Sequence, residues 1–206
     1  MMLWQHKIKQ PYEPLPKIVL SGPRVYICPP QPEHCMQWIN VRKRNQVHLA
    51  SLEPAWPKDA LNPSFFKKRL KRQIQQWKAD DAYPFLILKN SDEADTLIGG
   101  VNINHVCRGA AQYASLGYWL DRDHQGQGLM SEAMKLILRF SFETLHLHRM
   151  NAAVLPDNTK SISLLERNGF KQEGFAEKYI RINGEWQDHI LFGLPYERWK
   201  NMQATR

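Results

Sequence analysis

The stretch GYWLDRDHQGQGLMSEAMKLIL, residues 117–138, joins an apolar run to a charged corner, two glycines one residue apart and a helical pattern. The first turn of a helix leaves backbone N–H groups without partners and carries the positive end of the helix dipole. Gly126 and Gly128 have no Cβ, so an anion can approach the backbone closely there. This order predicts a phosphate-binding turn between a strand and a helix that runs to about Thr144.

Two glycines in a loop are more often only a turn, so the pattern needs support from other residues. The corner is not a P-loop, because no Gly-Lys-Ser/Thr follows it. It is not the dinucleotide-binding fingerprint either, because the third glycine of that motif is absent.

The apolar patterns around the corner predict an α/β (α+β) fold with a mixed sheet. Residues 83–89, 96–106 and 113–120 are typical of three successive strands, and 149–155 of a further strand. The strand–helix–strand unit over 113–155 predicts a parallel pair. A short helix is expected over 158–170, and Asn183-Gly184 is a strong hairpin signal.

Upstream, a short strand is expected within 24–30, then a helix over about 33–44 and a basic helix over 64–78. We expect one domain over residues 23–200, with an extended, loosely held arm over 1–22 and a tail over 201–206.

Bulk composition indicates an ordinary globular protein of 206 residues, of which 43 % are hydrophobic and 23 % charged. No apolar run suits a membrane span, and the N-terminus does not match a signal peptide. Cys28, Cys35 and Cys107 form no metal-binding or disulfide pattern, so we expect no metal, reduced thiols and a cytoplasmic location.

The formal net charge of +8 favours anionic partners such as nucleic acid, a ribosome surface or a polyphosphate cofactor. A solvated basic surface explains the charge equally well.

Two motifs resemble the GCN5-related N-acetyltransferases. QGQGLM followed by SEAM resembles their pyrophosphate loop, Q/R-x-x-G-x-G/A, with Gln125 at the first position and Gly128 at the fourth. Met130 stands where many members have Gly or Ala, a departure shared by the ribosomal-protein-alanine N-acetyltransferases of the RimJ and RimL type. HRMNAAVLPDNTKSISLLERNGF (148–170) resembles their strand–helix segment, with Asn158 and Ser161 in an N-x-x-S arrangement.

The resemblance covers about residues 20–199 and is closest to the RimJ branch over VNINHVCRGAAQYASLGYWL (101–120) and GFAEKYIRINGEWQDHILFGL (174–194). It implies a splayed central sheet flanked by helices, with acetyl-CoA as cosubstrate in the gap.

The resemblance also implies a cofactor site. The pyrophosphate would bind backbone N–H groups of Gln125, Gly126, Gln127, Gly128, Leu129 and Met130. The pantetheine arm would run beside the backbone of Tyr118, Trp119 and Leu120. Asn158 is expected to contact the cofactor amides, although an asparagine there can equally be a helix cap.

Ser161 is the predicted catalytic residue, because the leaving thiolate needs a hydrogen-bond or proton donor. Many relatives carry a tyrosine for this task at the position of Leu165. The general base stays open among His105, Glu185, Asp188 and water alone, since a terminal α-amine is already partly neutral at pH 7.

The predicted function is transfer of acetyl from acetyl-CoA to the N-terminal α-amine of a protein, a ribosomal protein beginning with Ala or Ser, by direct attack in a ternary complex. A small amine, an antibiotic or a lysine side chain are alternative acceptors.

The basic helix 64–78 is most simply a solvated face, but it could dock on ribosomal RNA or hold the 3′-phosphate of coenzyme A. A non-catalytic ribosome- or RNA-binding module is therefore the alternative from another class, and the sequence does not specify an oligomeric state.

Overall fold

The computed structural model describes residues 14–91 and 94–204 of the chain. Its strands are β1 (Leu20–Ser21), β2 (Val25–Cys28), β3 (Tyr83–Lys89), β4 (Thr96–Cys107), β5 (Tyr113–Leu120), β6 (Arg149–Val154), β7 (Lys171–Ile182) and β8 (Glu185–Pro195). Its helices are α1 (Cys35–Arg44), α2 (Gln46–Ala50), α3 (Pro63–Lys78), α4 (Leu129–Arg139), α5 (Thr159–Arg167) and α6 (Tyr196–Ala204).

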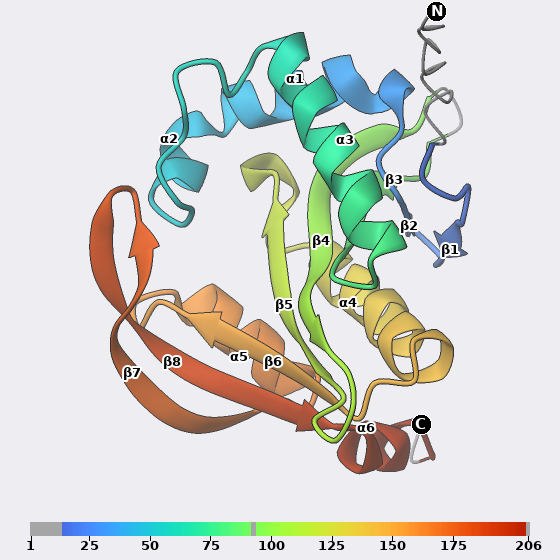
Figure 1. Cartoon of the computed structure of the whole chain (residues 1–206), viewed down its shortest axis with the longest axis vertical. Coiled ribbons are helices and arrows are strands. Elements are labelled where there is room, and N and C mark those ends of the chain that lie inside the picture. The colour runs from blue at the N-terminus through green and yellow to red at the C-terminus, as the bar shows by residue number, and fades with distance from the viewer. Residues whose placement is uncertain (1–13, 92–93, 205–206) are drawn as a thin grey trace, which may run out of the picture.

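One mixed sheet organises the molecule, with strand order β1-β2-β3-β4-β5-β6-β8-β7 (Figure 1). The β5–β6 pair is parallel and the other pairs are antiparallel. This confirms the predicted mixed α/β fold, including the parallel pair expected around α4.

The parallel pair is short. β5 and β6 are in register only at Tyr113↔Arg149, Ala114↔Met150 and Ser115↔Asn151. β5 continues along β4 to Leu120, whereas β6 continues along β8 to Val154. The two halves of the sheet therefore diverge beyond Ser115 and leave a wedge between β5 and β6.

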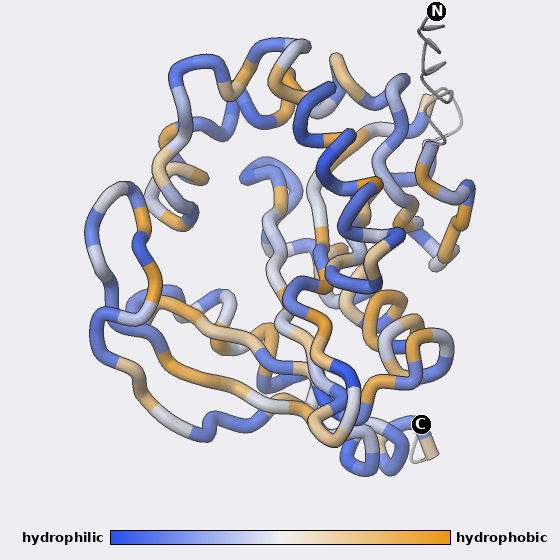
Figure 2. Tube along the Cα trace, viewed as in Figure 1, coloured by the Kyte–Doolittle hydropathy of each residue, from blue (hydrophilic) through white to orange (hydrophobic). Residues whose placement is uncertain are grey.

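Helices cover both faces of the sheet. On β3, Phe85 and Ile87 belong to the core shared with α4 and α5, whereas Leu86 and Leu88 pack with α1 and α3. This alternation follows from the two-residue period of a strand buried on both faces. In Figure 2 the trace of α3 is largely hydrophilic, while the central strands carry apolar segments.

Some expectations need correction. The N-terminal arm lies outside the described residues over 1–13, but its remainder is not loosely held: Leu15 is 2 % exposed, and β1 pairs with β2. α2 and α6 were not expected, and α6 continues through most of the predicted tail. The helix expected to reach Thr144 changes at Phe140 into a π-helical turn.

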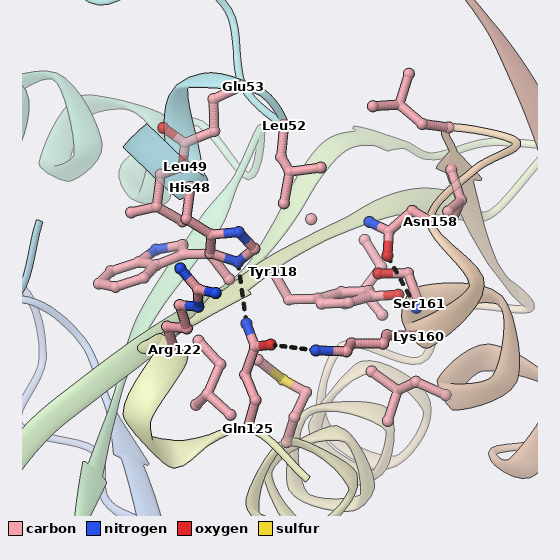
Figure 3. A pocket seen from close by; sticks show the side chains of 18 of the residues that line it. His48, Leu49, Leu52, Glu53, Tyr118, Arg122, Gln125, Asn158, Lys160 and Ser161 are labelled. Carbon is pink, nitrogen blue, oxygen red and sulfur yellow. Dashed lines mark hydrogen bonds between the residues drawn. The ribbon is translucent and has the colours of Figure 1, made fainter. Parts of the chain in front are cut away.

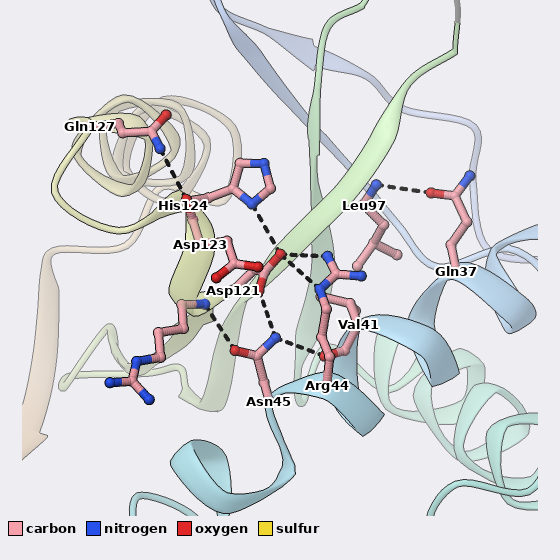
Figure 4. A network of polar contacts seen from close by, with 10 residues as sticks. Gln37, Val41, Arg44, Asn45, Leu97, Asp121, Asp123, His124 and Gln127 are labelled. Carbon is pink, nitrogen blue, oxygen red and sulfur yellow. Dashed lines mark hydrogen bonds and ion pairs between the residues drawn. The ribbon is translucent and has the colours of Figure 1, made fainter.

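A buried carboxylate fixes the corner after β5. The Asp121 side chain is 1 % exposed and accepts hydrogen bonds from Asn45 Nδ2 at 2.7 Å and Arg44 Nε at 3.1 Å (Figure 4). His124 Nδ1 lies 3.0 Å from the same carboxylate. The backbone N–H of Arg122 donates to Asn45 Oδ1 at 2.9 Å. The corner is thus bound to the C-terminal end of α1.

A second carboxylate binds the first turn of α4 to the chain at the start of β2. Glu132, in the first turn of α4, accepts from the backbone N–H groups of Arg24 and Val25 at 2.7 and 3.1 Å. Arg24 Nη1 donates to the carbonyl of Gln127 at 2.9 Å. The glycine turn between these anchors has little freedom to move.

The Asp121 network predicts an acid-labile contribution to stability. Its hydrogen-bonding partners Arg44, Asn45 and His124 outweigh desolvation, which acts in the opposite direction, and hold the Asp121 pKa at about 2. Because the folded-state pKa is depressed, the stabilisation is present above the unfolded pKa near 4 and is lost as pH falls through the folded value. We expect about 2 kcal/mol of unfolding free energy to disappear between pH 6 and pH 2.

Urea unfolding of the wild type and of Asp121→Asn across this range measures the effect. The substitution should remove this component and leave the acid dependence due to other groups. Parallel pH profiles for the two proteins would contradict the prediction.

Candidate active site: the cleft between the diverging strands

The wedge between β5 and β6 opens into a cleft of about 1120 Å³. Nearly all predicted site residues line it: Tyr118, Trp119, Leu120, Gln125, Gly126, Gly128, Leu129, Met130, Asn158 and Ser161. Gln127 is the exception, because its side chain donates to the carbonyl of Asp123 at 3.1 Å instead (Figure 4).

The glycine turn forms the wall at the N-terminus of α4. Gly126 and Gly128 both have φ of +76°, a left-handed conformation that side chains disfavour. Gly128 is the N-cap of α4 and provides no side-chain cap for the first turn. The N–H groups of that turn are therefore available to an anion. The basic side chains of Arg122 and Lys160 line the same region and add positive charge.

A polar bridge crosses the cleft beside this turn. The Gln125 amide nitrogen lies 3.0 Å from His48 Nε2, and Lys160 Nζ donates to Gln125 Oε1 at 3.1 Å (Figure 3). Burial lowers the pKa of His48, and the charges of Arg122 and Lys160 lower it further. His48 is consequently neutral at pH 7. The bridge connects α2, the corner and α5, which sequence spacing could not reveal.

At the start of α5, Asn158 caps the helix. Its Oδ1 accepts from the backbone N–H of Ser161 at 3.1 Å. The cap uses the oxygen of the amide and not its nitrogen, so the contact with a cofactor amide stays a prediction. Ser161 lines the cleft one turn into the helix (Figure 3).

The side chains of Tyr118 and Ser161 lie near each other in the cleft (Figure 3). The Tyr118 ring points from β5 toward Ser161 (Figure 3), and its buried hydroxyl has no hydrogen-bond partner among the described residues. Burial raises the pKa of Tyr118 to about 12, although the neighbouring Ser161 hydroxyl lowers it in part. Leu165 is fully buried in the core, so its position does not face the cleft.

The three side chains considered as general base do not line the cleft. His105 and Glu185 are exposed, and Asp188 accepts from the backbone N–H of Lys178 at 2.8 Å. The next residue, His189, is 3 % exposed and does line the cleft. Its Nδ1 lies 3.0 Å from the carbonyl of Gln187 and must donate to it, which leaves Nε2 of the neutral ring as the proton acceptor.

The far end of the cleft is built from α1, the segment after α2 and the β7–β8 hairpin. Arg42 donates to the Glu53 carboxylate through both terminal nitrogens. The Glu53 carbonyl accepts from the backbone N–H of Asn183, at the hairpin tip, at 2.9 Å. The hairpin and this segment thereby meet over the cleft, as the placement of β7, β8 and α2 in Figure 1 shows.

The basic residues of α3 outside the apolar stripe, Lys67, Lys68, Lys71 and Arg72, are exposed and do not line the cleft. They form a solvated face, and their position does not support the alternative in which they hold a cofactor phosphate. Contact of this face with RNA stays a prediction.

Among the described residues, no group of three His, Cys, Asp or Glu side chains is arranged to hold a metal ion. Within the same residues no helix is long and apolar enough to cross a membrane.

A splayed sheet, a glycine turn with free N–H groups at its opening and hydroxyl groups in the wedge suit a coenzyme A-dependent acyltransferase. The family model described as "Acetyltransferase (GNAT) domain" matches residues 24–171. The chain belongs to this family, and it is an acetyl-CoA-dependent N-acetyltransferase.

Among its relatives is the Bacillus subtilis protein named "Probable N-acetyltransferase YjcK", 34 % identical over 85 % of this chain and 96 % of that protein. The Escherichia coli ribosomal protein uS5-alanine N-acetyltransferase is 32 % identical over 90 % of this chain and 94 % of that enzyme. The structure of Mycobacterium smegmatis RimJ in complex with CoA-disulfide superposes with a TM-score of 0.80 at 26 % identity, covering 91 % of both chains.

The turn predicts how a charge at Gly126 affects cofactor affinity. A Cβ at Gly126 meets no atom within 4 Å, so a side chain has room there, and the strain comes only from the positive φ of +76°. Gly126→Asp would place a carboxylate beside the pyrophosphate, and like charges a few ångströms apart repel by a few kcal/mol near a protein surface. We expect coenzyme A affinity to fall by about 30-fold or more, measured by isothermal titration calorimetry.

Gly126→Asn is the matched control, because Asn has the same shape and a similar tolerance for positive φ. It should share any small loss of thermal stability but keep most of the affinity. Equal affinities of the Asp and Asn variants would show that the turn does not hold the pyrophosphate.

Proposed function

We propose that the protein transfers the acetyl group of acetyl-CoA to the N-terminal α-amine of a protein, specifically a ribosomal protein beginning with Ala or Ser. The observation that carries this proposal is a continuous cleft, which joins the glycine turn to Ser161 and continues to the segment after α2 and the hairpin at its far end. The names of its relatives support the acceptor class, including the uS5-alanine enzyme and the ribosomal-protein-serine acetyltransferase of Escherichia coli.

The glycine turn and the first turn of α4 bind the pyrophosphate through backbone N–H groups. Beyond Ser115 the edge of β5 that faced β6 has no strand partner among the residues that the structure describes, so the backbone of Tyr118, Trp119 and Leu120 can bind the pantetheine amides as an added strand would. The amide nitrogen of Asn158 is a further donor.

Acetyl-CoA supplies a thioester, whose C–S bond breaks as the amine nitrogen bonds to the carbonyl carbon. Sulfur keeps the electron pair of the broken bond and needs a proton. Ser161 Oγ and Tyr118 Oη donate hydrogen bonds that stabilise the departing thiolate from α5 and β5, and the thiolate then takes its proton from solvent water. With its raised pKa, Tyr118 stays protonated well above neutral pH and therefore acts mainly as a hydrogen-bond donor.

His189 Nε2 accepts the proton that the attacking amine loses, directly or through a water molecule. The demand on this base is modest, because an α-amine has a pKa of about 8 and is partly neutral at pH 7. Direct attack within a ternary complex then needs no covalent enzyme intermediate.

Free-thiol release tests the function. The protein is mixed with acetyl-CoA and peptides beginning with Ala or Ser, and with the same peptides blocked at the N-terminus. Mass spectrometry should show one acetyl group on the free α-amine of the unblocked peptides only. Acetylation of polyamines, aminoglycosides or internal lysines, with none at the α-amine, would replace the acceptor class with one of the alternatives.

If the hydroxyl groups of Ser161 and Tyr118 stabilise the departing sulfur, removing either one should slow the reaction by an amount that depends on the leaving group. Ser161→Ala and Tyr118→Phe should each lower kcat by about tenfold to a hundredfold, the effect of removing one donor to a developing charge. Coenzyme A affinity should change little. Acetylseleno-CoA releases a selenolate, a much weaker base than a thiolate, so both variants should recover most of the lost rate with this donor.

The wild type assayed with both donors sets the reference ratio. An equal loss with the thioester and the selenoester would mean that the hydroxyl groups stabilise the fold or the carbonyl and not the departing sulfur.

A further inference from the structure

One arginine at the far end of the cleft has no anionic partner. Arg69 projects from α3 and lines both the main cleft and a small adjoining cavity, together with Asn102 and Trp119. Its guanidinium lies over the Trp38 ring, 5.8 Å from the ring centroid. Among the residues that the structure describes, no carboxylate or carbonyl accepts a hydrogen bond from it.

The neighbouring Arg42, unlike Arg69, has an anionic partner. Arg42 forms a two-pronged ion pair with Glu53 and lies 4.2 Å from the centroid of Trp56. Glu53 Oε2 also accepts from Trp56 Nε1 at 2.8 Å. The Glu53 carboxylate is therefore already paired with Arg42 and Trp56. The three side chains Arg42, Glu53 and Arg69 together carry one uncompensated positive charge.

The surroundings of Arg69 disfavour that charge. Burial lowers its pKa to about 10, with further lowering by Arg42 and Arg72, while Glu53 acts in the opposite direction. The side chain is still charged at neutral pH. Arg69 is half-buried. Removing part of a guanidinium from water without an ion-pair partner carries a cost, which a carboxylate bound in the cleft would offset.

The position of Arg69 separates it from the cofactor phosphates. Tyr118 packs with the core on the side of α4 and α5, whereas Trp119, the next residue, packs with α1 and α3. The glycine turn, Arg122 and Lys160 are grouped at the opening beside α4 and α5. Arg69 lies on the Trp119 side, close to Arg42 and Glu53 at the far end of the cleft.

We propose that Arg69 binds a carboxylate of the acceptor, so that the enzyme selects N-termini that carry Asp or Glu within the first few residues after the acetylated amine. The planar guanidinium suits a carboxylate because it can donate two parallel hydrogen bonds. This inference rests on the proposed transfer to a protein N-terminus and names a preference within that class.

A peptide scan tests the proposal on the wild-type enzyme. The peptides begin with Ala, are amidated at the C-terminus, and carry Gln at positions 2 to 5 or a single Glu moved through these positions. We expect at least one Glu position to raise kcat/KM by about tenfold, mainly through a lower KM, as for one charged hydrogen bond gained. Equal rates for the Glu and Gln peptides would overturn the proposal while leaving N-terminal acetylation intact.

Variants on α3 assign the preference. Arg69→Gln should abolish the advantage of the Glu peptide, so that the variant acetylates the Glu and Gln peptides with equal kcat/KM. Arg69→Lys keeps the positive charge but loses the planar guanidinium with its two parallel donors. This variant should retain part of the preference for the Glu peptide. Arg72→Gln is the matched control, because Arg72 is exposed on the same helix and does not line the cleft. A Glu preference that survives in Arg69→Gln would remove Arg69 from the site.

A last comparison identifies the source of the carboxylate. The dipeptide Ala-Gln is assayed with a free and with an amidated C-terminus. A preference for the free dipeptide, without any Glu preference in the longer peptides, would overturn the assignment to protein N-termini in favour of a small amino acid-like acceptor. Failure to acetylate every peptide would instead reject the proposed function and this inference with it.

Discussion

The short parallel pairing of β5 with β6 is the constraint on which the site depends. Three residue pairs join the two halves of the sheet, and then each strand follows its other neighbour. Backbone N–H and C=O groups on the inner edge of β5 need hydrogen-bond partners once they are shielded from water. A linear molecule with amides along its length satisfies them in the way a strand would. The same divergence therefore creates the cleft and determines which kind of molecule fits it.

The turn at the mouth of this cleft is costly to form and is held by contacts outside it. Two residues have left-handed backbones, and the first turn of α4 has no side-chain cap. These features leave N–H groups free for an anion, but alone they would favour a mobile loop. Asp121 binds the corner to α1, and Glu132 binds α4 to the chain at Arg24 and Val25. An anion therefore meets donors that are already in place.

The sequence predicted what local periodicity determines and missed what tertiary packing determines. Alternation and Gly-x-Gly spacing predicted the central strands, the parallel pair and the turn, because these follow from neighbouring residues. α2 was missed because it spans only five residues. For the base, the sequence offered Asp188, but the two-residue period of β8 turns Asp188 away from the cleft and its neighbour His189 into it. Only the pairing register shows which of the two faces inward.

The same alternation on β5 separates the two halves of the reaction. Tyr118 faces the side of Ser161, where the sulfur would leave, while Trp119 faces the side of Arg42 and Arg69. An acceptor entering on the Trp119 side would approach the thioester carbonyl across the strand from the departing sulfur. The acceptor and the departing sulfur would then be held on different faces of β5. The single-residue step from Tyr118 to Trp119 thus places side chains of one strand on both faces of the sheet.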